Sequence, residues 1–270
     1  MTGVYRYRSG TVPLLVSIPH DGCELAPGME QRMTEAGLGL PDTDWHVAAL
    51  YEFATELGAH VLTANYSRYV VDLNRPRDDE ALYEDRVSTG LCPTRTFSGE
   101  DIYLPGEEPD AEEIAGRITG YWRPYHDRVR SLLDAMRKEA GYALLWDAHS
   151  ICAEVPTLFE GTLPDLNVGT DDGRSCDAAI EAAVMHMAGA SSYTSVLNGR
   201  FRGGFITRSY GAPERNVHAL QLELAQRAYM DEATLQYDRE RAERLALTIR
   251  SMLGTYLAVA EAASEHAPVG

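Results

Sequence analysis

The chain has 270 residues, of which 44% are hydrophobic and 24% charged, as in ordinary globular proteins. No apolar run approaches the roughly 20 residues of a transmembrane helix, and residues 1–10 lack the apolar core of a secretory signal, so we expect a cytoplasmic protein. The net charge of −17 argues against nucleic acid or an anionic membrane as a partner, although a local arginine cluster can still bind an anionic substrate.

The first third of the chain predicts three short strands and one helix. The apolar run over 13–18 is bounded by polar residues and predicts a buried strand. Apolar residues recur at helical spacing over 42–57, and Gly58 follows as a helix-ending residue. Residues 60–64 and 69–73 predict two further strands.

Residues 76–109 form the most irregular stretch of the sequence. They are rich in Pro, Asp, Glu, Gly and Thr and are too long for an ordinary connection, so we expect a functional active-site loop or lid. Helical spacing returns over 111–138, where Pro124 is the candidate point of a break. Residues 143–148 predict another buried strand.

The last third of the chain alternates helices with strands. Residues 175–188 predict a helix, and 192–197 and 204–208 predict two strands joined by a turn rich in Gly and Arg. A buried strand is expected over 218–224, and a long amphipathic helix over 231–263.

This alternation predicts an α/β fold with three layers (α/β/α) and a mostly parallel mixed central sheet, because parallel strands are joined by helices that cover both faces. No repeat or interdomain linker interrupts the pattern, so we expect a single domain over residues 1–270. The cysteines are widely spaced and form no C-x-x-C pair, which favours reduced thiols.

Two histidines end two of the predicted strands. His20 follows the run over 13–18, and His149 follows the run over 143–148. Ligands of open α/β sheets bind beyond the carboxyl ends of the strands, so we expect both imidazoles in one site. A lone histidine at a strand end is usually a hydrogen-bonded structural residue, but the pair together predicts a shared divalent metal ion.

A third ligand is expected, because catalytic zinc usually has three protein ligands and a water molecule. The candidates are Asp44, Glu24, Asp21, Asp147 and His46. Asp44 lies in the first turn of the helix predicted over 42–57, where its alternative role is to stabilise the helix N-terminus. Asp147 shares a strand face with His149, so it is also a candidate for orienting that imidazole from behind.

Arginines form the second group of candidate site residues, with members in two segments: Arg68, Arg75, Arg200, Arg202 and Arg208. A guanidinium binds a carboxylate through two parallel hydrogen bonds, and Asn74 beside Arg75 adds an amide donor. The alternative interpretation is a set of surface arginines in salt bridges of an acidic protein.

Glu223 lies inside the apolar run over 218–224. Burying a carboxylate is costly unless it is paired or functional, so Glu223 is the candidate general base. The alternative is a carboxylate on a half-exposed strand face, which its alternation with Gln221 permits.

Taken together, seven segments in this order resemble the N-formylglutamate amidohydrolase family: SIPHDG (17–22), TDWHV (43–47), SRYVVDLNRP (67–76), WDAHS (146–150), NGRFRGG (198–204), ITRSYG (206–211) and VHALQLE (217–223). The resemblance implies a zinc-carboxypeptidase-like fold, shared with aspartoacylase. It also implies hydrolysis of N-formyl-L-glutamate, a small dianion, to glutamate and formate, which in many bacteria is the last step of histidine degradation.

The resemblance implies that His20 and His149 hold the metal ion, for which zinc is the expected identity. Carboxypeptidases take a further ligand from a glutamate three residues after the first histidine, and this chain has Cys23 there. Asp44 is therefore the preferred substitute, with Glu24 as the alternative.

The same resemblance implies roles for the remaining candidates. Glu223 matches the catalytic glutamate, and Arg68 matches the arginine that polarises the scissile carbonyl. Asn74 and Arg75 match a pair that holds a substrate carboxylate. The second carboxylate is assigned to three residues: Arg202, Arg208 and Tyr210. The alternatives are a metalloamidase for another N-acyl acidic amino acid, or an inactive binder of acidic metabolites.

Overall fold

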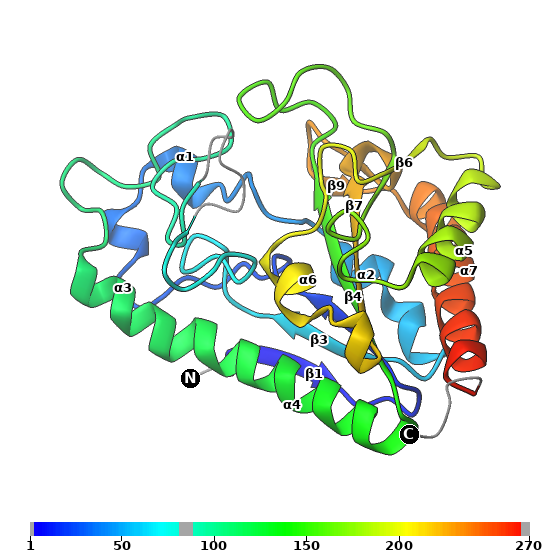
Figure 1. Cartoon of the computed structure of the whole chain (residues 1–270). Coiled ribbons are helices and arrows are strands. Elements are labelled where there is room, and N and C mark those ends of the chain that lie inside the picture. The colour runs from blue at the N-terminus through cyan, green and yellow to red at the C-terminus, as the bar shows by residue number, and fades with distance from the viewer. Residues whose placement is uncertain (1–2, 81–88, 266–270) are drawn as a thin grey trace.

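The computed structural model describes residues 3–80 and 89–265, and its centre is a seven-stranded mixed sheet (Figure 1). The order across the sheet is β1 (Tyr5–Arg8), β3 (His60–Ala64), β2 (Leu14–Ile18), β4 (Ala143–Ile151), β7 (Val217–Ala225), β5 (Leu166–Gly169) and β6 (Ser195–Leu197). β3, β2, β4 and β7 are parallel to one another. β1 and β5 pair antiparallel with β3 and β7, and β6 is parallel to β5. The mostly parallel mixed sheet is therefore confirmed.

The three central strands are buried along their whole length, which explains why they are visible as apolar runs. Every residue of β2, β4 and β7 is buried, because helices cover both faces of the sheet. The strands predicted over 13–18, 143–148 and 218–224 match these elements, and β4 continues to Ile151.

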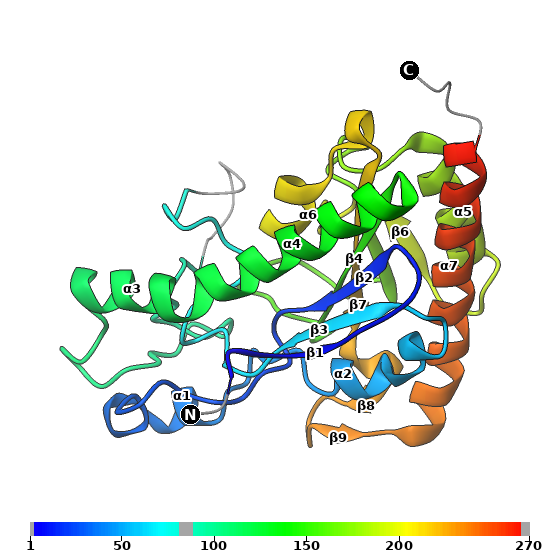
Figure 2. The same cartoon turned by 90° about the horizontal axis from the view of Figure 1, so that it is seen from below.

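Helices pack on both faces of the sheet, as Figures 1 and 2 show. One face is covered by α2 (Val47–Leu50), α5 (Ala178–Gly189) and α7 (Arg239–Glu265), and the other by α4 (Arg123–Ala140) and α6 (Phe205–Tyr210). Leu245 and Ile249 of α7 belong to the same core cluster as Trp146 of β4. Tyr125 and Val129 of α4 belong to a second cluster with Leu145. The three-layer arrangement is confirmed.

The helix expected over 42–57 is interrupted. His46 adopts a left-handed backbone with φ of 66°, so α2 begins only at Val47, and a short 3-10 helix, η2 (Glu52–Thr55), follows it. The segment before α2 is held against the sheet instead, because the buried Asp44 carboxylate accepts a hydrogen bond from the backbone N–H of Ser150 in β4.

Two predicted strands are wrong. Residues 69–73 form turns without a strand partner, and Tyr69 and Val70 pack into a separate apolar cluster beside the sheet. Residues 204–208 belong largely to the helix α6, in which the Arg208 N–H donates to the Gly204 carbonyl. A short apolar run can be buried in either conformation, so its composition does not distinguish strand from helix. The strand over 192–197 shortens to β6, and β1 and β5 lie where no strand was expected.

The helix expected over 111–138 exists but contains one irregular turn. α3 (Ala111–Arg117) continues through a π-helical turn, η3 (Ile118–Trp122), into α4. Pro124 lies just after this turn. Proline lacks an N–H group and cannot donate a helical hydrogen bond here, but the helix continues through Pro124 into the rest of α4.

The C-terminal helix starts later than expected because residues 230–237 form a small hairpin of β8 (Met230–Asp231) and β9 (Gln236–Tyr237). The other short elements are η1 (Glu30–Arg32), α1 (Glu35–Leu38), η4 (Pro213–Arg215) and η5 (Gln226–Ala228). Among the described residues, no helix has the length and apolar composition that crossing a membrane requires.

The stretch over 76–109 has no helix or strand in its described parts, and residues 81–88 lie outside the described residues. An isolated bridge between Met33 and Tyr103 connects its second half to the separate apolar cluster that contains Tyr69 and Val70. Motion of this stretch as a lid stays a prediction.

Candidate active site

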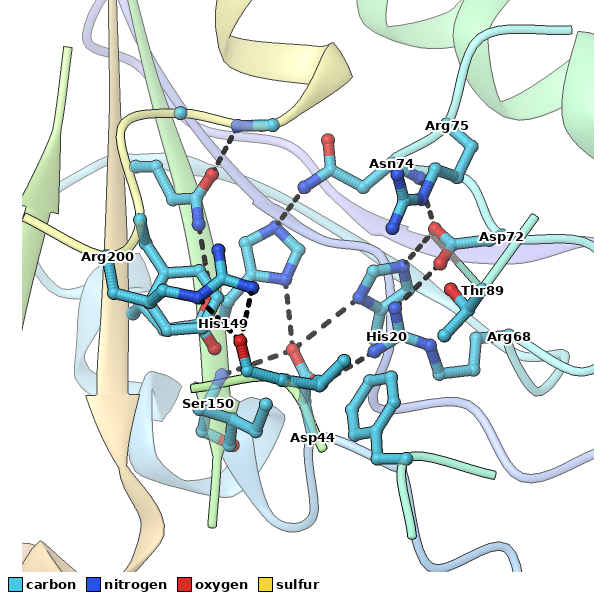
Figure 3. A pocket seen from close by; sticks show the side chains of 18 residues that line it. His20, Asp44, Arg68, Asp72, Asn74, Arg75, Thr89, His149, Ser150 and Arg200 are labelled. Carbon is cyan, nitrogen blue, oxygen red and sulfur yellow. Dashed lines mark hydrogen bonds and ion pairs between the residues drawn. The ribbon is translucent and has the colours of Figure 1, made fainter. Parts of the chain in front are cut away.

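The candidate site is a pocket at the carboxyl ends of the central parallel strands (Figure 3). His20 follows β2, His149 lies near the end of β4, and Glu223 lies near the end of β7. Asp44 reaches the pocket from the segment before α2, and the side chain of Arg68 from the turn after β3. Residues far apart in sequence therefore meet where the fold class predicts a ligand.

Three buried side chains converge at the centre of the pocket. His20, Asp44 and His149 each offer one ligand atom, and these atoms lie within 4.8 Å of one another. Asp44 Oδ2 is 3.0 Å from His149 Nδ1 and 3.7 Å from His20 Nδ1. Two ligands of a tetrahedral zinc ion are about 3.4 Å apart, given bonds of 2.0–2.2 Å. The three atoms therefore have the spacing that one small cation requires.

The outer nitrogens of both imidazoles are held by carboxylates. His20 Nε2 donates to Asp72 Oδ1 at 2.8 Å, and His149 Nε2 lies 3.1 Å from Asp147 Oδ2. Within the described residues, the buried His20 Nδ1 has no hydrogen-bond partner. A carboxylate behind each imidazole turns its Nδ1 toward the centre, which is the arrangement typical of metal-binding histidines. The donor set fits a metal ion.

The pKa shifts of Asp44 and His149 agree with a site that binds a cation. Burial opposes ionisation of Asp44, but the hydrogen bond from His149 and the nearby His20 imidazole hold the pKa of the carboxyl below its usual value. Burial likewise opposes protonation of His149, but Asp147 and Asp44 on its two sides hold the imidazole pKa above its usual value. A cationic group is therefore favoured between these carboxylates.

The other candidate ligands lie elsewhere. Asp21 Oδ1 accepts from the backbone N–H of Ala48, and His46 Nε2 contacts the Leu235 carbonyl at 2.9 Å. Cys23 is exposed. Glu24 is not among the residues that line the pocket. Asp147 stands behind His149, as its shared strand face predicts, so Asp44 is the carboxylate that the fold brings to the two histidines.

Glu223 is the direct neighbour of His149 across the sheet. The two residues are register partners in the parallel pair of β4 and β7, so their side chains share one face. Glu223 Oε2 accepts from Gln221 Nε2 at 3.0 Å, and Gln221 Oε1 accepts from the Gly204 N–H. Burial, with the nearby Asp44 charge adding to it, raises the pKa of Glu223 to about 8. A carboxyl with such a pKa can both accept and return a proton near neutral pH.

Arg68 lines the same pocket beside the two histidines. Its Nη2 donates to Asp72 Oδ2 at 2.6 Å, its Nη1 lies 3.7 Å from Asp44 Oδ1, and its guanidinium carbon lies 4.7 Å from the ring centre of Phe97. Asp72 thus contacts both His20 and Arg68. Sequence reasoning missed Asp72, because it falls in the segment 69–73 that predicts a strand.

Both the oxygen and the nitrogen of the Asn74 side-chain amide contact other residues of the protein. Its Oδ1 accepts from the Ile206 N–H at 2.8 Å, and its Nδ2 lies 2.9 Å from His149 Nε2. Asn74 therefore connects the start of α6 to His149 of the candidate metal site. The half-buried Arg75 lines the pocket, and its backbone carbonyl accepts from Trp122 Nε1.

The three residues expected to bind a second carboxylate do not line the pocket. Arg202 Nη1 lies 3.4 Å from Asp172, and Arg208 Nη1 lies 3.3 Å from Asp171. The Tyr210 hydroxyl contacts His126 Nδ1 at 2.9 Å. Arg200, from the same arginine-rich segment, lines the pocket instead.

Comparisons with known proteins extend these observations. The sequence model of the N-formylglutamate amidohydrolase family matches residues 12–230. The chain is 50% identical to the N-formylglutamate deformylase of Pseudomonas aeruginosa over 260 residues, which cover 96% of this chain and 97% of that protein. It is 46% identical to the deformylase of Pseudomonas putida with the same coverage.

Two solved structures share the fold. The crystal structure of an N-formylglutamate amidohydrolase from Ralstonia eutropha JMP134 aligns with a TM-score of 0.81 at 21% identity, covering 98% of this chain and all of that one. A gene product of Agrobacterium tumefaciens aligns with a TM-score of 0.74 at 19% identity, covering 96% and 97%. At these identities the two structures support the fold alone.

Proposed function

Because the chain belongs to the N-formylglutamate amidohydrolase family and is a hydrolase, we propose that it cleaves N-formyl-L-glutamate to L-glutamate and formate with the help of one divalent metal ion. The observation that supports this most is the convergence of His20, Asp44 and His149 beside the buried Glu223. Binding alone needs no general base, so this combination favours catalysis over an inactive binding protein.

His20, Asp44 and His149 would hold the metal ion, and Asp72 and Asp147 would orient the two imidazoles. A bound divalent ion lowers the pKa of a water molecule and polarises a carbonyl oxygen. Two imidazoles and a carboxylate favour zinc, and the same set also accepts Mn, Co or Fe.

The protein's own groups move the proton and stabilise charge. Glu223 accepts the proton of the attacking water and returns it to the amide nitrogen as the C–N bond breaks, which releases the amine. Arg68 donates hydrogen bonds to the formyl oxygen as negative charge develops on it, and Asp72 holds the guanidinium in place. Arg75 binds the α-carboxylate of the substrate, while Asn74 fixes the segment that carries it.

The metal requirement is tested with a chelator. We expect hydrolysis of N-formyl-L-glutamate to be lost when metal is removed and to return when zinc is added. Full activity in metal-free enzyme would exclude the proposed metal dependence. Rates for N-formyl-L-aspartate and N-acetyl-L-glutamate, measured beside it, separate this substrate from those of a related metalloamidase.

The role of Glu223 is tested by Glu223→Gln, with Glu160→Gln at an exposed position as the matched control. We expect the Glu223 variant to bind zinc as tightly as the wild type and to lose about 10²–10⁴ in kcat, the usual contribution of a general base. A kcat close to that of the control variant would remove Glu223 from this role. A place in histidine degradation and a cytoplasmic location stay predictions.

A further inference from the structure

We infer that Gln221 positions the general base, because it holds the Glu223 carboxylate in one orientation and anchors it to the backbone of Gly204. The inference rests on the proposed function, since it concerns how Glu223 accepts and returns the proton. Gln221 acts on the reaction only through Glu223, so it is a positioning residue and not a catalytic one.

The first observation is that the partners of the Gln221 amide fix which way it points. A backbone N–H can only donate, so the atom 2.6 Å from the Gly204 nitrogen is the amide oxygen, Oε1. The amide nitrogen, Nε2, lies 3.0 Å from Glu223 Oε2 and donates to it. The Gln221 side chain is buried, with 3% of the residue exposed, so water has little access to either bond. The folded protein therefore offers a hydrogen-bond donor to the Glu223 carboxylate.

The second observation is a repeated arrangement on the two central strands. Asp147 and Gln221 are register partners of β4 and β7, and His149 and Glu223 form the next pair on the same face. Asp147 Oδ2 lies 3.1 Å from His149 Nε2, and Gln221 binds Glu223. Each strand thus places a supporting side chain two positions before the residue that takes part in the reaction. Gln221 has the same relation to the base that Asp147 has to the metal-site imidazole.

The third observation is that the anchor of Gln221 is itself tightly placed. Gly169 of β5 is the register partner of Gln221 on the other side of β7. A Cβ added to Gly169 would lie 2.5 Å from the backbone nitrogen of Gly203, so the turn that ends at Gly204 packs directly against β5. The position of the Gly204 N–H is therefore set by the sheet, and Gln221 transmits this position to Glu223.

A neutral amide suits this task better than a charged side chain. The terminal torsion of a glutamate is broad, so a carboxylate needs a hydrogen bond to keep a single orientation. A lysine or arginine at position 221 would also donate, but its charge would stabilise the ionised carboxylate and weaken it as a base. The amide of Gln221 supplies the donor without a net charge. Its own burial is tolerated because both of its ends are hydrogen-bonded.

The first part of the test is Gln221→Met, which keeps the length of the side chain and removes both hydrogen bonds. We expect kcat for N-formyl-L-glutamate to fall about 10–10²-fold, the usual value of one hydrogen bond to a charged group. KM and zinc affinity should stay close to those of the wild type, because the base acts in the chemical step. Gln236→Met, at an exposed position of β9, is the matched control and should leave both constants unchanged.

The second part is a double-mutant cycle with Glu223→Gln. If Gln221 acts through Glu223, adding Gln221→Met to Glu223→Gln should change kcat by less than about 2-fold, because the base that it positions is already absent. An equal fall of kcat in both backgrounds would overturn the inference, since it indicates a structural role that is independent of the base. A change confined to KM would overturn it as well.

If Gln221→Met does not fold, the same cycle with Gln221→Asn decides, because the shorter amide stays polar but cannot reach both partners. A wild type that does not hydrolyse N-formyl-L-glutamate, or a Glu223→Gln variant with unchanged kcat, would refute the proposed function and the inference with it. An additive cycle in an active enzyme that depends on Glu223 refutes the inference alone, so the two failures are distinguishable.

Discussion

Asp72 shows how one buried carboxylate can organise two functional groups. Its Oδ1 accepts from His20 and its Oδ2 from Arg68, so both side chains depend on the same residue for their orientation. Burial opposes ionisation of Asp72, but Arg68 and His20 hold its pKa well below the usual value, so the carboxylate is charged at neutral pH. A single substitution here should therefore affect the metal site and the arginine together.

We predict that Asp72→Asn weakens zinc binding about 10–100-fold, the usual effect of losing a carboxylate behind a metal-binding histidine. It should also lower kcat at saturating zinc, because Arg68 loses its ionic partner. Zinc titration and steady-state kinetics check both effects, with Asp134→Asn on the exposed side of α4 as the control. Unchanged zinc affinity would contradict the orienting role of Asp72.

For single residues, the sequence predicts the position of a side chain well where the residue belongs to a regular strand or helix, because the spacing then fixes which face it is on. Asp147 lies behind His149 because residues two apart on a strand share a face, and the sequence predicts this alternative. Arg200 and Arg202 are also two apart, but they lie in an irregular turn, so spacing does not say which one enters the pocket. Their different positions follow from partners such as Leu158 and Asp172, which are distant in sequence.

Among the elements, α6 is connected to the site through Gly204, the residue that precedes it and lines the pocket. A Cβ added to Gly204 would lie 2.3 Å from Asn74 Nδ2, and Asn74 is held by the Ile206 N–H. The absence of a side chain at Gly204 therefore sets the distance between α6 and the segment of Arg75. Strands β2, β4 and β7 can be predicted from their apolar runs, whereas α6 cannot, because its conformation depends on these tertiary contacts.

We predict that Gly204→Ala lowers kcat/KM by displacing Asn74 and its neighbour Arg75. Gly254→Ala in α7 is the paired variant, since no atom lies within 4 Å of the added Cβ. It should raise the free energy of unfolding by about 0.5–1 kcal/mol, because alanine has the higher helix propensity, and leave activity unchanged. Chemical denaturation and kinetics on both variants check this, and full activity in Gly204→Ala would contradict it.

The second element-scale prediction concerns His126 of α4, which is fully buried between Leu73 and Tyr210. Burial lowers its pKa to about 3, a hydrogen bond to the Leu73 carbonyl acts in the opposite direction, and Arg130 lowers it further. Between this value and the unfolded value of about 6.5, only the unfolded chain binds the proton, so stability falls as pH falls.

The wild type should therefore lose about 2 kcal/mol more unfolding free energy than His126→Gln between pH 7 and pH 5. Urea unfolding at both pH values measures the difference, with His186→Gln, an exposed histidine of α5, as the control. Parallel pH profiles of the wild type and His126→Gln would contradict this, because they would show that folding does not change the pKa of His126.

For the whole molecule, the candidate metal site joins three segments that belong to different parts of the chain. His20 follows β2, Asp44 precedes α2, and His149 belongs to β4. The fold class follows from the sequence because the alternation of strands and helices depends on local pattern. The path of the stretch over 76–109 does not, because its buried apolar side chains are divided among different clusters: Leu91 packs with residues of the sheet, whereas Ile102 and Tyr103 pack with Tyr69 and Val70.

We predict that zinc stabilises the folded protein, because the unfolded chain does not hold the three ligands together. At a free zinc concentration of 100 times Kd, the free energy of unfolding should rise by about 2.7 kcal/mol. Thermal unfolding at several zinc concentrations measures this as an increase in Tm. His149→Ala should show no such increase, and an equal increase in that variant would place the stabilising ion elsewhere.

The register of β4 and β7 has a consequence for how such an enzyme can change. Because His149 and Glu223 are paired across two hydrogen-bonded strands, their separation follows from the fixed interstrand distance of about 4.8 Å. Other residues that line the pocket, Arg75 and Arg200 among them, lie outside these strands. Substitutions or insertions in the surrounding loops can therefore alter the rest of the pocket while the separation of His149 and Glu223 stays the same. New specificities are accessible from this scaffold without rebuilding its chemistry.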